Sequence, residues 1–399
     1  MSQIFSSIKE REEKLLLRSY SRYPLAIVQG KMSRLWDADG KEYVDLLAGI
    51  AVTALGHCHE EIAATLEQQA HKLWHVSNLF YQEEQLELAE VLLSTTHHDK
   101  VFFCNSGAEA NEAAIKLARR YYKKVKQRDA YEIITLEGCF HGRTLGTLAA
   151  TGRQTLSDGF EPLPEGFRQV PINDIKAMEA AITDKTCAVL LEVVQGEGGV
   201  IPLPGDYLKA LEALCRKKDI LLICDEVQAG FCRTGCFWAF QNYGLQPDII
   251  STAKALANGL PMGAMMATSE VAKGFEAGSH ATTFGGGALT SAVATQVVRI
   301  MLRDRLAERA AKLGQALIAK LRDLQQRLPG KIKDIRGLGL MLGIEIGENC
   351  PQVWQELIHR GFICSLSHNV TLRLLPALTI DEADLTNFVQ TLADILASD

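Results

Sequence analysis

Short apolar runs alternate with helix-like stretches between about residue 60 and residue 285 of this chain. Each run has the length of a strand that is buried on both faces of a sheet. The runs are Val101–Cys104, Glu132–Leu136, Ala188–Glu192, Leu221–Cys224 and Asp248–Thr252. Their alternation with helical patterns predicts an α/β fold, in which helices cover both faces of a mostly parallel sheet.

The two ends of the chain follow a different pattern. Residues Arg34–Asp45 read as two short strands around a turn at Asp39-Gly40. Residues 288–327 read as one long helical stretch that stops at Pro329-Gly330. Its expected apolar stripe consists of Leu302, Leu306, Leu313, Leu317 and Leu321. Strand-like runs follow at Ile332–Arg336, Leu342–Ile346 and Leu372–Leu375.

Because the N-terminal hairpin has no sheet of its own, we expect it to pack with the strands near the other end of the chain. Residues 1–55 would then form the first part of a small α+β domain, and residues 56–287 would form a large domain. Residues 288–399 would supply the linking helix and the rest of the small domain.

The composition narrows the class of protein. Of the 399 residues, 47% are hydrophobic and 23% are charged, as is usual for a soluble globular protein. A formal net charge of −6 gives no reason to expect nucleic acid or an anionic membrane as a partner. Because there is no membrane-length apolar run and no signal pattern at Met1–Phe5, the sequence predicts a cytoplasmic protein.

The ten cysteines include no CxxC pair, and several lie inside apolar runs, so we expect reduced, buried thiols. Cys232 and Cys236 are four residues apart, but no second pair of soft ligands lies near them in the sequence. We therefore expect no metal site.

Charged side chains follow two of the predicted strands. The run Ile220–Cys224 is followed by Asp225 and Glu226, and the run Asp248–Ala253 is followed by Lys254. Ligands collect where the strands of an α/β sheet stop. Asp225 and Lys254 could form a salt bridge. They could also hold opposite sides of a pyridoxal phosphate ring, with the carboxylate at the ring nitrogen and the lysine as a Schiff base.

Three acids, Glu192, Asp225 and Asp248, are placed at the ends of buried strands. A carboxylate in such a place is costly unless it meets a cation or a donor. This coincidence favours a functional site over structural ion pairs alone. Gln228 follows Asp225 by three residues, and its amide could donate to a phenolate oxygen.

Residues 105–109 have the pattern of a phosphate site or of an ordinary capped helix. Small residues follow the strand Val101–Cys104 and precede a helix, whose first N–H groups could hold a phosphate. Alternatively, Ser106 is a plain N-cap, with Glu109 three residues on. Neither GxxxxGK[ST] nor GxGxxG occurs, which excludes a nucleotide P-loop and a nicotinamide fingerprint.

Two further segments have the chemistry for cofactor or substrate contacts. Phe140 follows a strand and could stack on a flat cofactor, while Arg143 could bind a carboxylate. The alternatives are a core phenylalanine and a surface arginine. Thr282 and Thr283 could bond a phosphate oxygen or simply belong to a loop.

Together these motifs are specific, and the chain resembles the class III (ω-amino acid) aminotransferases, a subgroup of the fold-type I pyridoxal phosphate enzymes. The resemblance runs nearly end to end and is greatest to the acetylornithine branch of the family. It is carried by Gly49–Val52, Leu55–His57, Asn105–Asn111, Phe140–Thr144, Gln195–Gly199, Asp225–Gln228, Arg233–Gly235, Pro247–Ile249 and Ala253–Leu256. It implies a large domain with a mostly parallel seven-stranded sheet, a small α+β domain from both chain ends, and a homodimer.

The resemblance also implies roles around pyridoxal 5'-phosphate. Lys254 would form the Schiff base and move the proton, and Asp225 would pair with the ring nitrogen. Gln228 would reach the ring hydroxyl, and Phe140 would stack on the ring. Further cofactor contacts would come from Ser106, Gly107, Ala108, His141, Glu192 and Val227, and from the partner subunit's Thr283.

For the substrates, the resemblance implies that Arg143, with Thr282 nearby, binds the carboxylate at the far end. Arg373 would bind the α-carboxylate of glutamate, and Glu197 would neutralise Arg373 while an amine without a neighbouring carboxylate reacts. The implied reaction moves the terminal amine of N2-acetylornithine to 2-oxoglutarate and gives N-acetylglutamate 5-semialdehyde and L-glutamate, a step of arginine biosynthesis. The alternatives are ornithine, N-succinylornithine, 4-aminobutyrate or another ω-amine as donor, a mutase or decarboxylase reaction, and a non-catalytic scaffold.

Several positions differ from the usual family residues without removing a catalytic group. They are Val193, Phe231-Cys232, Asn258, Ala281, Gly287-Ala288 and Ser367-His368. Because they cluster around the expected pocket and dimer loop, they bear on which amine is the donor and not on the reaction type.

Overall fold

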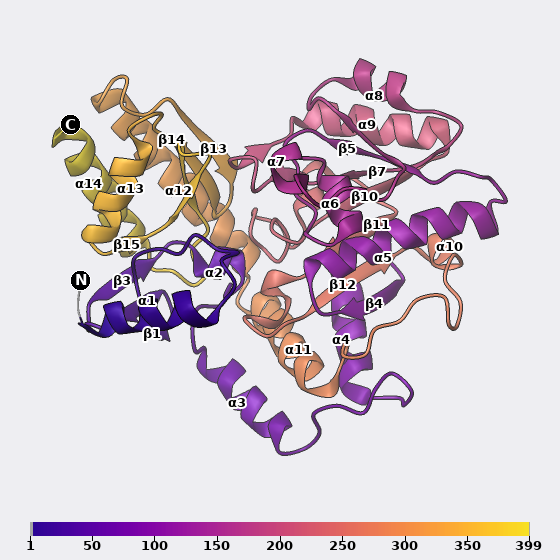
Figure 1. The fold of residues 1–399 in the computed structure, drawn as a ribbon, viewed down its shortest axis with the longest axis horizontal. Coiled ribbons are helices and arrows are strands. Elements are labelled where there is room, and N and C mark those ends of the chain that lie inside the picture. Colours follow the sequence, from indigo (N-terminus) through magenta and orange to yellow (C-terminus); the bar gives the residue numbers. More distant parts are fainter. Residues whose placement is uncertain (1–2, 399) are drawn as a thin grey trace.

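The computed structural model describes residues 3–398, which fold into a larger part and a smaller part joined by long helices (Figure 1). The larger part is built on a seven-stranded sheet, and the smaller part contains strands from near both ends of the chain. The expected α/β fold, with a mostly parallel seven-stranded sheet and a smaller α+β part, is confirmed.

All five predicted apolar runs form strands of the large sheet, whose order is β4-β12-β11-β10-β7-β5-β6. Neighbouring strands from β11 to β6 are parallel, and β12 is antiparallel to both of its neighbours. The strands are β4 (Lys100–Cys104), β5 (Glu132–Leu136), β6 (Phe167–Val170), β7 (Thr186–Leu191), β10 (Leu221–Asp225), β11 (Ile249–Thr252) and β12 (Gly263–Ala267).

The sheet is buried because its side chains enter separate cores on its two faces. Alternate residues of β10 point in opposite directions, so Leu222 belongs to one buried cluster and Ile223 to the other. This explains why the central strands read as continuous apolar runs. The larger part also contains α3 (Glu60–Ala70), α4 (Glu83–Leu93), α5 (Gly107–Arg120), α6 (Leu145–Thr151), α7 (Gln154–Ser157), α8 (Ile175–Ala181), α9 (Gly205–Lys218) and α10 (Ser269–Ala272), and a short ribbon of β8 (Val194–Gln195) with β9 (Ile201–Pro202). The short α2 (Ala48–Ala51) lies beside the N-terminal strands of the smaller part (Figure 1).

The predicted N-terminal hairpin is present, and it pairs with a strand from the other end of the chain. Strands β2 (Arg34–Asp37) and β3 (Glu42–Asp45) are antiparallel, and β15 (Phe362–Ile363) runs parallel to β3. With β1 (Ile27–Lys31) they form one four-stranded sheet. A second sheet has the order β13 (Asp334–Leu338), β14 (Met341–Glu345), β17 (Thr371–Leu374) and β16 (Ser365–Ser367), and helices α13 (Cys350–His359) and α14 (Glu382–Ser398) lie in the same part.

The prediction of a single helix over 288–327 is wrong, because the chain breaks it at Asp304 and Arg305. Helix α11 (Ala288–Arg303) packs on α3 and α4, whereas α12 (Leu306–Arg327) packs on β13 and α14. Arg305 has a φ of 51°, a left-handed backbone that no continuous α-helix contains. Leu302 therefore falls outside the expected stripe and is 45% exposed, while Leu306, Leu313, Leu317 and Leu321 are buried.

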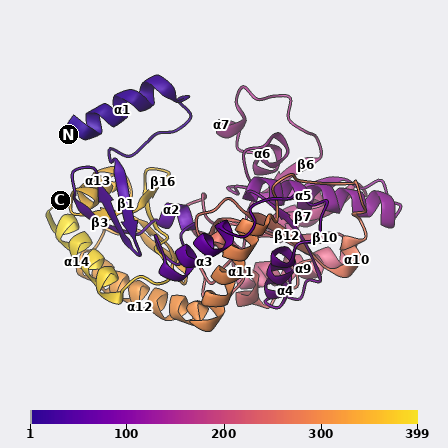
Figure 2. The ribbon, with the colours of Figure 1, turned by 90° about the horizontal axis from the view of Figure 1, so that it is seen from below.

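Helix α1 (Gln3–Leu15) stands away from both sheets and has no buried residue (Figure 2). Its apolar side chains Ile4, Ile8 and Leu15 are exposed. Within residues 3–398, none of the helices has the length and apolar content needed to cross a membrane.

Candidate active site

A cavity of about 420 Å³ opens where strands β7, β10 and β11 of the large sheet end. Such strand ends are where α/β folds bind ligands. Twelve of the predicted site residues line it: Ser106, Gly107, Ala108, Phe140, His141, Arg143, Glu192, Glu197, Asp225, Val227, Gln228 and Lys254. Arg373 lies beside them and contacts Glu197, whereas Thr282 and Thr283 lie elsewhere.

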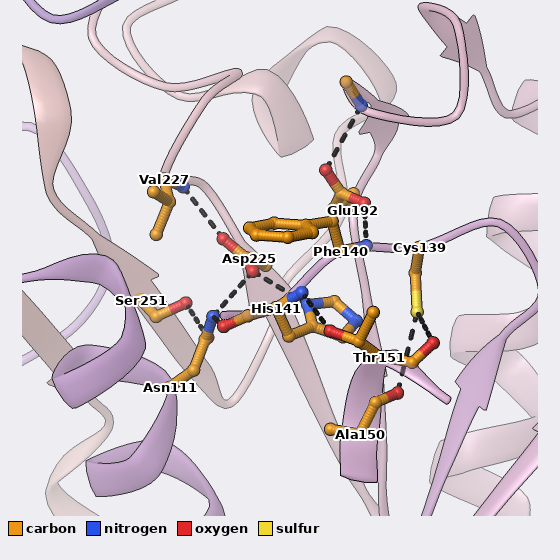
Figure 3. Close-up of polar contacts among 11 residues, drawn as sticks. Asn111, Cys139, Phe140, His141, Ala150, Thr151, Glu192, Asp225, Val227 and Ser251 are labelled. Atoms are coloured by element: carbon orange, nitrogen blue, oxygen red, sulfur yellow. Dashed lines mark hydrogen bonds and ion pairs between the residues drawn. The ribbon is translucent and has the colours of Figure 1, made fainter. Parts of the chain in front are cut away.

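Asp225 ends β10 and is the centre of a buried polar network (Figure 3). Its Oδ2 accepts a hydrogen bond from Asn111 Nδ2 at 2.7 Å, and His141 Nδ1 lies 2.8 Å from the same oxygen. The backbone N–H of Val227 donates to Oδ1 at 3.0 Å. Burial alone would lower the pKa of His141, but its neighbours, the Asp225 carboxylate among them, raise it well above its ordinary value.

Asn111 belongs to this network, although no role was predicted for it. Besides Asp225, its Nδ2 donates to the carbonyl oxygen of His141 at 2.8 Å, and Ser251 Oγ donates to its Oδ1 at 2.5 Å. It therefore ties helix α5 to β10, β11 and the loop after β5. The one available signal was a polar residue on the alanine-rich, buried face of a helix.

Glu192 follows β7 and joins two loops at the cavity. The backbone N–H groups of Phe140 and Gly196 donate to its carboxylate at 3.0 and 3.2 Å. Burial, together with the nearby Asp225 charge, raises the pKa of Glu192 to about 7. Glu192 thus fixes both the aromatic residue Phe140 and the loop that carries Glu197.

Asp248 does not lie at the cavity, so the prediction that groups it with Glu192 and Asp225 at the ends of strands is wrong. It lies before β11, not after it, and so belongs to the opposite edge of the sheet. There it pairs with Arg216 Nη1 at 2.7 Å and accepts from the backbone N–H of Leu222 at 2.8 Å. Asp248 is a structural ion-pair partner at the start of the strand.

Lys254 follows β11 and presents a buried amine to the cavity. Within residues 3–398, its Nζ makes no hydrogen bond or ion pair, so the salt bridge to Asp225 does not form. Its φ of 44° is unusual for a side chain this large, and such strain collects at functional sites. Burial lowers the pKa of Lys254 to about 8; the Glu197 carboxylate acts against this shift, and the Arg373 charge acts with it.

The start of α5 has both features expected of residues 105–109, a serine N-cap and N–H groups that could hold a phosphate. Ser106 Oγ accepts from the N–H of Glu109 at 3.2 Å, which is the expected cap. The N–H groups of Gly107 and Ala108 lie in the first turn, where no helical acceptor exists, and face the cavity. A Cβ at Gly107 would lie 2.7 Å from Val227 Cγ1, which is too close, so only glycine fits at this point without a shift of Val227.

Arg373, on β17, is covered by the carboxylate of Glu197. Its Nη1 donates to Glu197 Oε1 at 2.5 Å and to the carbonyl oxygen of Gly196 at 3.2 Å, and its Nε donates to Ser365 Oγ at 2.9 Å. Burial would raise the pKa of Glu197, but the Arg373 guanidinium outweighs it and lowers that pKa. Gln228 Nε2 lies 3.4 Å from the same Glu197 oxygen.

The remaining predicted residues lie at the edge of the cavity or outside it. Arg143 is exposed at the mouth, with its guanidinium carbon 5.6 Å from the centroid of the Phe140 ring. Thr282 Oγ1 accepts from Asn105 Nδ2 at 3.1 Å, and Thr283 is exposed. Both threonines line a separate recess and not the cavity of their own chain.

Comparisons with known proteins agree with this geometry. The family model described as aminotransferase class-III matches residues 17–396. Acetylornithine aminotransferase of Methanothermobacter thermautotrophicus is 44% identical over 390 residues, 98% of each chain. That of Methanocaldococcus jannaschii is 44% identical over 387 residues, 96% of each chain.

Solved structures give the same family. Ornithine aminotransferase from Toxoplasma gondii ME49 aligns with a TM-score of 0.95 at 31% identity, covering 99% of this chain and 95% of that one. Acetylornithine aminotransferase from Elizabethkingia anophelis aligns with a TM-score of 0.89 at 32% identity, covering 99% of both chains. On these matches the chain belongs to the class III aminotransferases, which are pyridoxal phosphate-dependent transaminases.

Proposed function

We propose that this protein transfers the terminal amine of N2-acetylornithine to 2-oxoglutarate, with L-glutamate as the second product, in the cytoplasm. The relatives named acetylornithine aminotransferase, at 44% identity over almost the whole chain, support this choice of donor. The structural observation that carries it is Arg373 covered by Glu197, because this pair suits an enzyme that alternates between two unlike substrates.

The cavity fits pyridoxal phosphate. The free N–H groups at Gly107 and Ala108 suit its phosphate, and Asp225 suits its protonated ring nitrogen. The Phe140 ring offers a face for stacking, and Lys254 offers an amine that no group among residues 3–398 binds. When bound, the cofactor supplies an electron sink for the carbon that carries the reacting amine.

Lys254 is the residue suited to moving the proton. With a pKa near 8, a useful fraction of its amine is neutral at physiological pH, whereas an ordinary lysine would be almost fully protonated. Its neutral Nζ can take the proton from the substrate carbon and return it as the amine is transferred. Asp225 stays in place because Asn111, His141 and the Val227 N–H hold it.

Arg373 and Glu197 would distinguish the two half-reactions. A terminal amine has no carboxylate on its reacting carbon, so Glu197 can remain paired with Arg373 while this substrate is bound. The buried guanidinium then keeps a counter-ion, and the cost of an unpaired buried charge is avoided. The α-carboxylate of 2-oxoglutarate then displaces Glu197 and takes its place. Arg143, which lines the cavity, would bind the carboxylate at the far end of either substrate.

The proposed active unit is a homodimer in which the partner subunit's Thr283 completes the phosphate site. Thr283 is exposed and lies outside the cavity of its own chain, next to the exposed ring of Phe284. The segment 74–86 contacts this loop, since the ring centroids of His75 and Phe284 are 5.3 Å apart. The segment carries further large exposed apolar side chains, namely Trp74, Leu79, Phe80, Tyr81 and Leu86. Such a concentration suits a protein interface.

A complementation experiment tests this arrangement. Lys254→Ala and Thr283→Ala proteins are unfolded together and refolded, so that mixed dimers form. Each mixed dimer then holds one complete site, and activity should exceed the sum of the two separate proteins. No gain from mixing, with dimers shown by light scattering, would contradict a shared site.

A panel of amine donors with 2-oxoglutarate as acceptor tests the proposed reaction. Glutamate formation should be fastest from N2-acetylornithine. Faster reaction with ornithine would favour the activity named for the Toxoplasma gondii structure, and no glutamate from any ω-amine would refute the proposed function.

A further inference from the structure

We propose that His368 is a positioning residue that sets how readily Arg373 is uncovered, by holding the main chain of the loop that carries Glu197. His368 lies in the turn between β16 and β17, and its Nε2 is 2.8 Å from the carbonyl oxygen of Glu197. A carbonyl oxygen only accepts, so His368 Nε2 is the donor, whether its ring is neutral or charged. The proposal rests on the proposed function, since it concerns the exchange of substrates at Arg373.

Uncovering Arg373 involves the main chain of this loop as well as one side chain. Arg373 Nη1 is shared by the Glu197 carboxylate, by the carbonyl oxygen of Gly196 and by Gln228 Oε1, which lies 3.4 Å away. An incoming carboxylate competes with all three acceptors and is repelled by the carbonyl oxygen next to it. Gly196 is also packed against Gln228, since a Cβ at Gly196 would lie 2.0 Å from Gln228 Oε1. A larger opening therefore requires the backbone at 196–197 to shift.

Two side chains of the smaller part hold that backbone on either side of Gly198. His368 binds the carbonyl oxygen of Glu197, and Arg336 Nε donates to the carbonyl oxygen of Gly199 at 3.0 Å. Arg336 is itself fixed by Glu345 Oε2 at 2.7 Å. Of these two tethers, His368 acts directly on the residue whose carboxylate covers Arg373.

The turn itself does not favour a histidine at this position. His368 and Asn369 have φ values of 52° and 58°, a left-handed backbone that suits glycine and asparagine. His368 is exposed, so it is not needed to fill the core. Its contact with Glu197 is the interaction that a glycine in the same turn would lack.

The test compares the holoenzymes of His368→Gly and Asn369→Gly. Both changes relieve a positive φ in the same exposed turn, but only the first removes the bond to Glu197. His368→Gly should lower the KM for 2-oxoglutarate about two- to tenfold, since one hydrogen bond no longer favours the covered state. The KM for the ω-amine donor should change less than twofold, because the covered state still predominates, and kcat should stay within twofold.

A second readout does not depend on turnover. Hydrogen–deuterium exchange over residues 194–200 should be faster in His368→Gly than in the wild type and unchanged in Asn369→Gly. Unchanged exchange and an unchanged KM for 2-oxoglutarate in His368→Gly would overturn the proposal, as would equal effects of the two substitutions. If the wild type transaminates no ω-amine, the proposed function fails, and the exchange measurement still decides whether His368 holds the loop.

Discussion

Replacing Lys254 by methionine should stabilise the cofactor-free protein at neutral pH while it abolishes transamination. The Lys254 amine is buried without a partner in residues 3–398, and burial lowers its pKa from 10.5 to about 8. The folded protein therefore holds the charged amine less favourably than the unfolded chain does. Methionine keeps a long, unbranched side chain but has no charge to bury.

The magnitude follows from the pKa. A change from 10.5 to about 8 corresponds to about 3 kcal/mol of unfolding free energy. The Lys254 amine is buried, but the residue as a whole is only half-buried at the cavity wall, so solvent in the cavity screens the charge and reduces the expected gain to about 1–3 kcal/mol. Since the folded pKa is lower than the unfolded one, the penalty is complete below about pH 8. It shrinks as the pH rises and vanishes above about pH 10.5, where the amine is neutral in both states.

Urea denaturation of the cofactor-free wild type and Lys254→Met, at pH 7 and near pH 10.5, measures the effect. Lys312→Met is the matched control, because Lys312 is an exposed lysine on α12 and its replacement should change stability by less than about 0.5 kcal/mol. A variant no more stable than the wild type at pH 7 would refute the reasoning. So would a gain that is the same at both pH values.

Three further substitutions have definite expected outcomes. Asp225→Asn keeps the shape of the side chain but removes its charge, so kcat should fall at least about 100-fold with unchanged circular dichroism, and the pKa of His141 measured by NMR should fall. Arg373→Lys replaces the planar guanidinium, which can bind a carboxylate through two parallel hydrogen bonds, by a single ammonium group. In stopped-flow measurements of the half-reactions, kcat/KM for 2-oxoglutarate should fall about 10- to 100-fold, whereas kcat/KM for the ω-amine should change less than about threefold. Arg305→Gly relieves a left-handed backbone between α11 and α12 and should raise the unfolding free energy in urea by about 1 kcal/mol; an unchanged or lower value would show that the strain is offset elsewhere.

The sheet and the cavity could be predicted because they depend on local sequence. Continuous apolar runs located five strands, and the charged residues at the ends of two of these runs, Asp225 and Lys254, pointed to the cavity. Strands β6 and β12 were missed. β6 has two polar residues, Arg168 and Gln169, in the middle of its four, and β12, Gly263–Ala267, has no β-branched residue to distinguish it from a loop.

The errors have physical causes that single residues illustrate. Neither glycine nor proline marks the break at Arg305, so the helical pattern continued through it. Asp248 was misplaced because a strand's apolar run does not show which end faces the ligand. Asn111 was missed because its partners, Asp225 and His141, are distant in the sequence and meet only in the folded chain.

The pairing of β3 with β15 has a consequence for synthesis of the chain on the ribosome. Val44 emerges more than three hundred residues before its partner Phe362. At about 5–20 residues per second, one edge of the β2–β3 hairpin stays without its partner strand for roughly 15–60 s. During that time the hairpin presents free backbone N–H and C=O groups, which are open to pairing with other chains. We therefore expect chaperones to bind the nascent chain at this hairpin until residues 362 and 363 have been added.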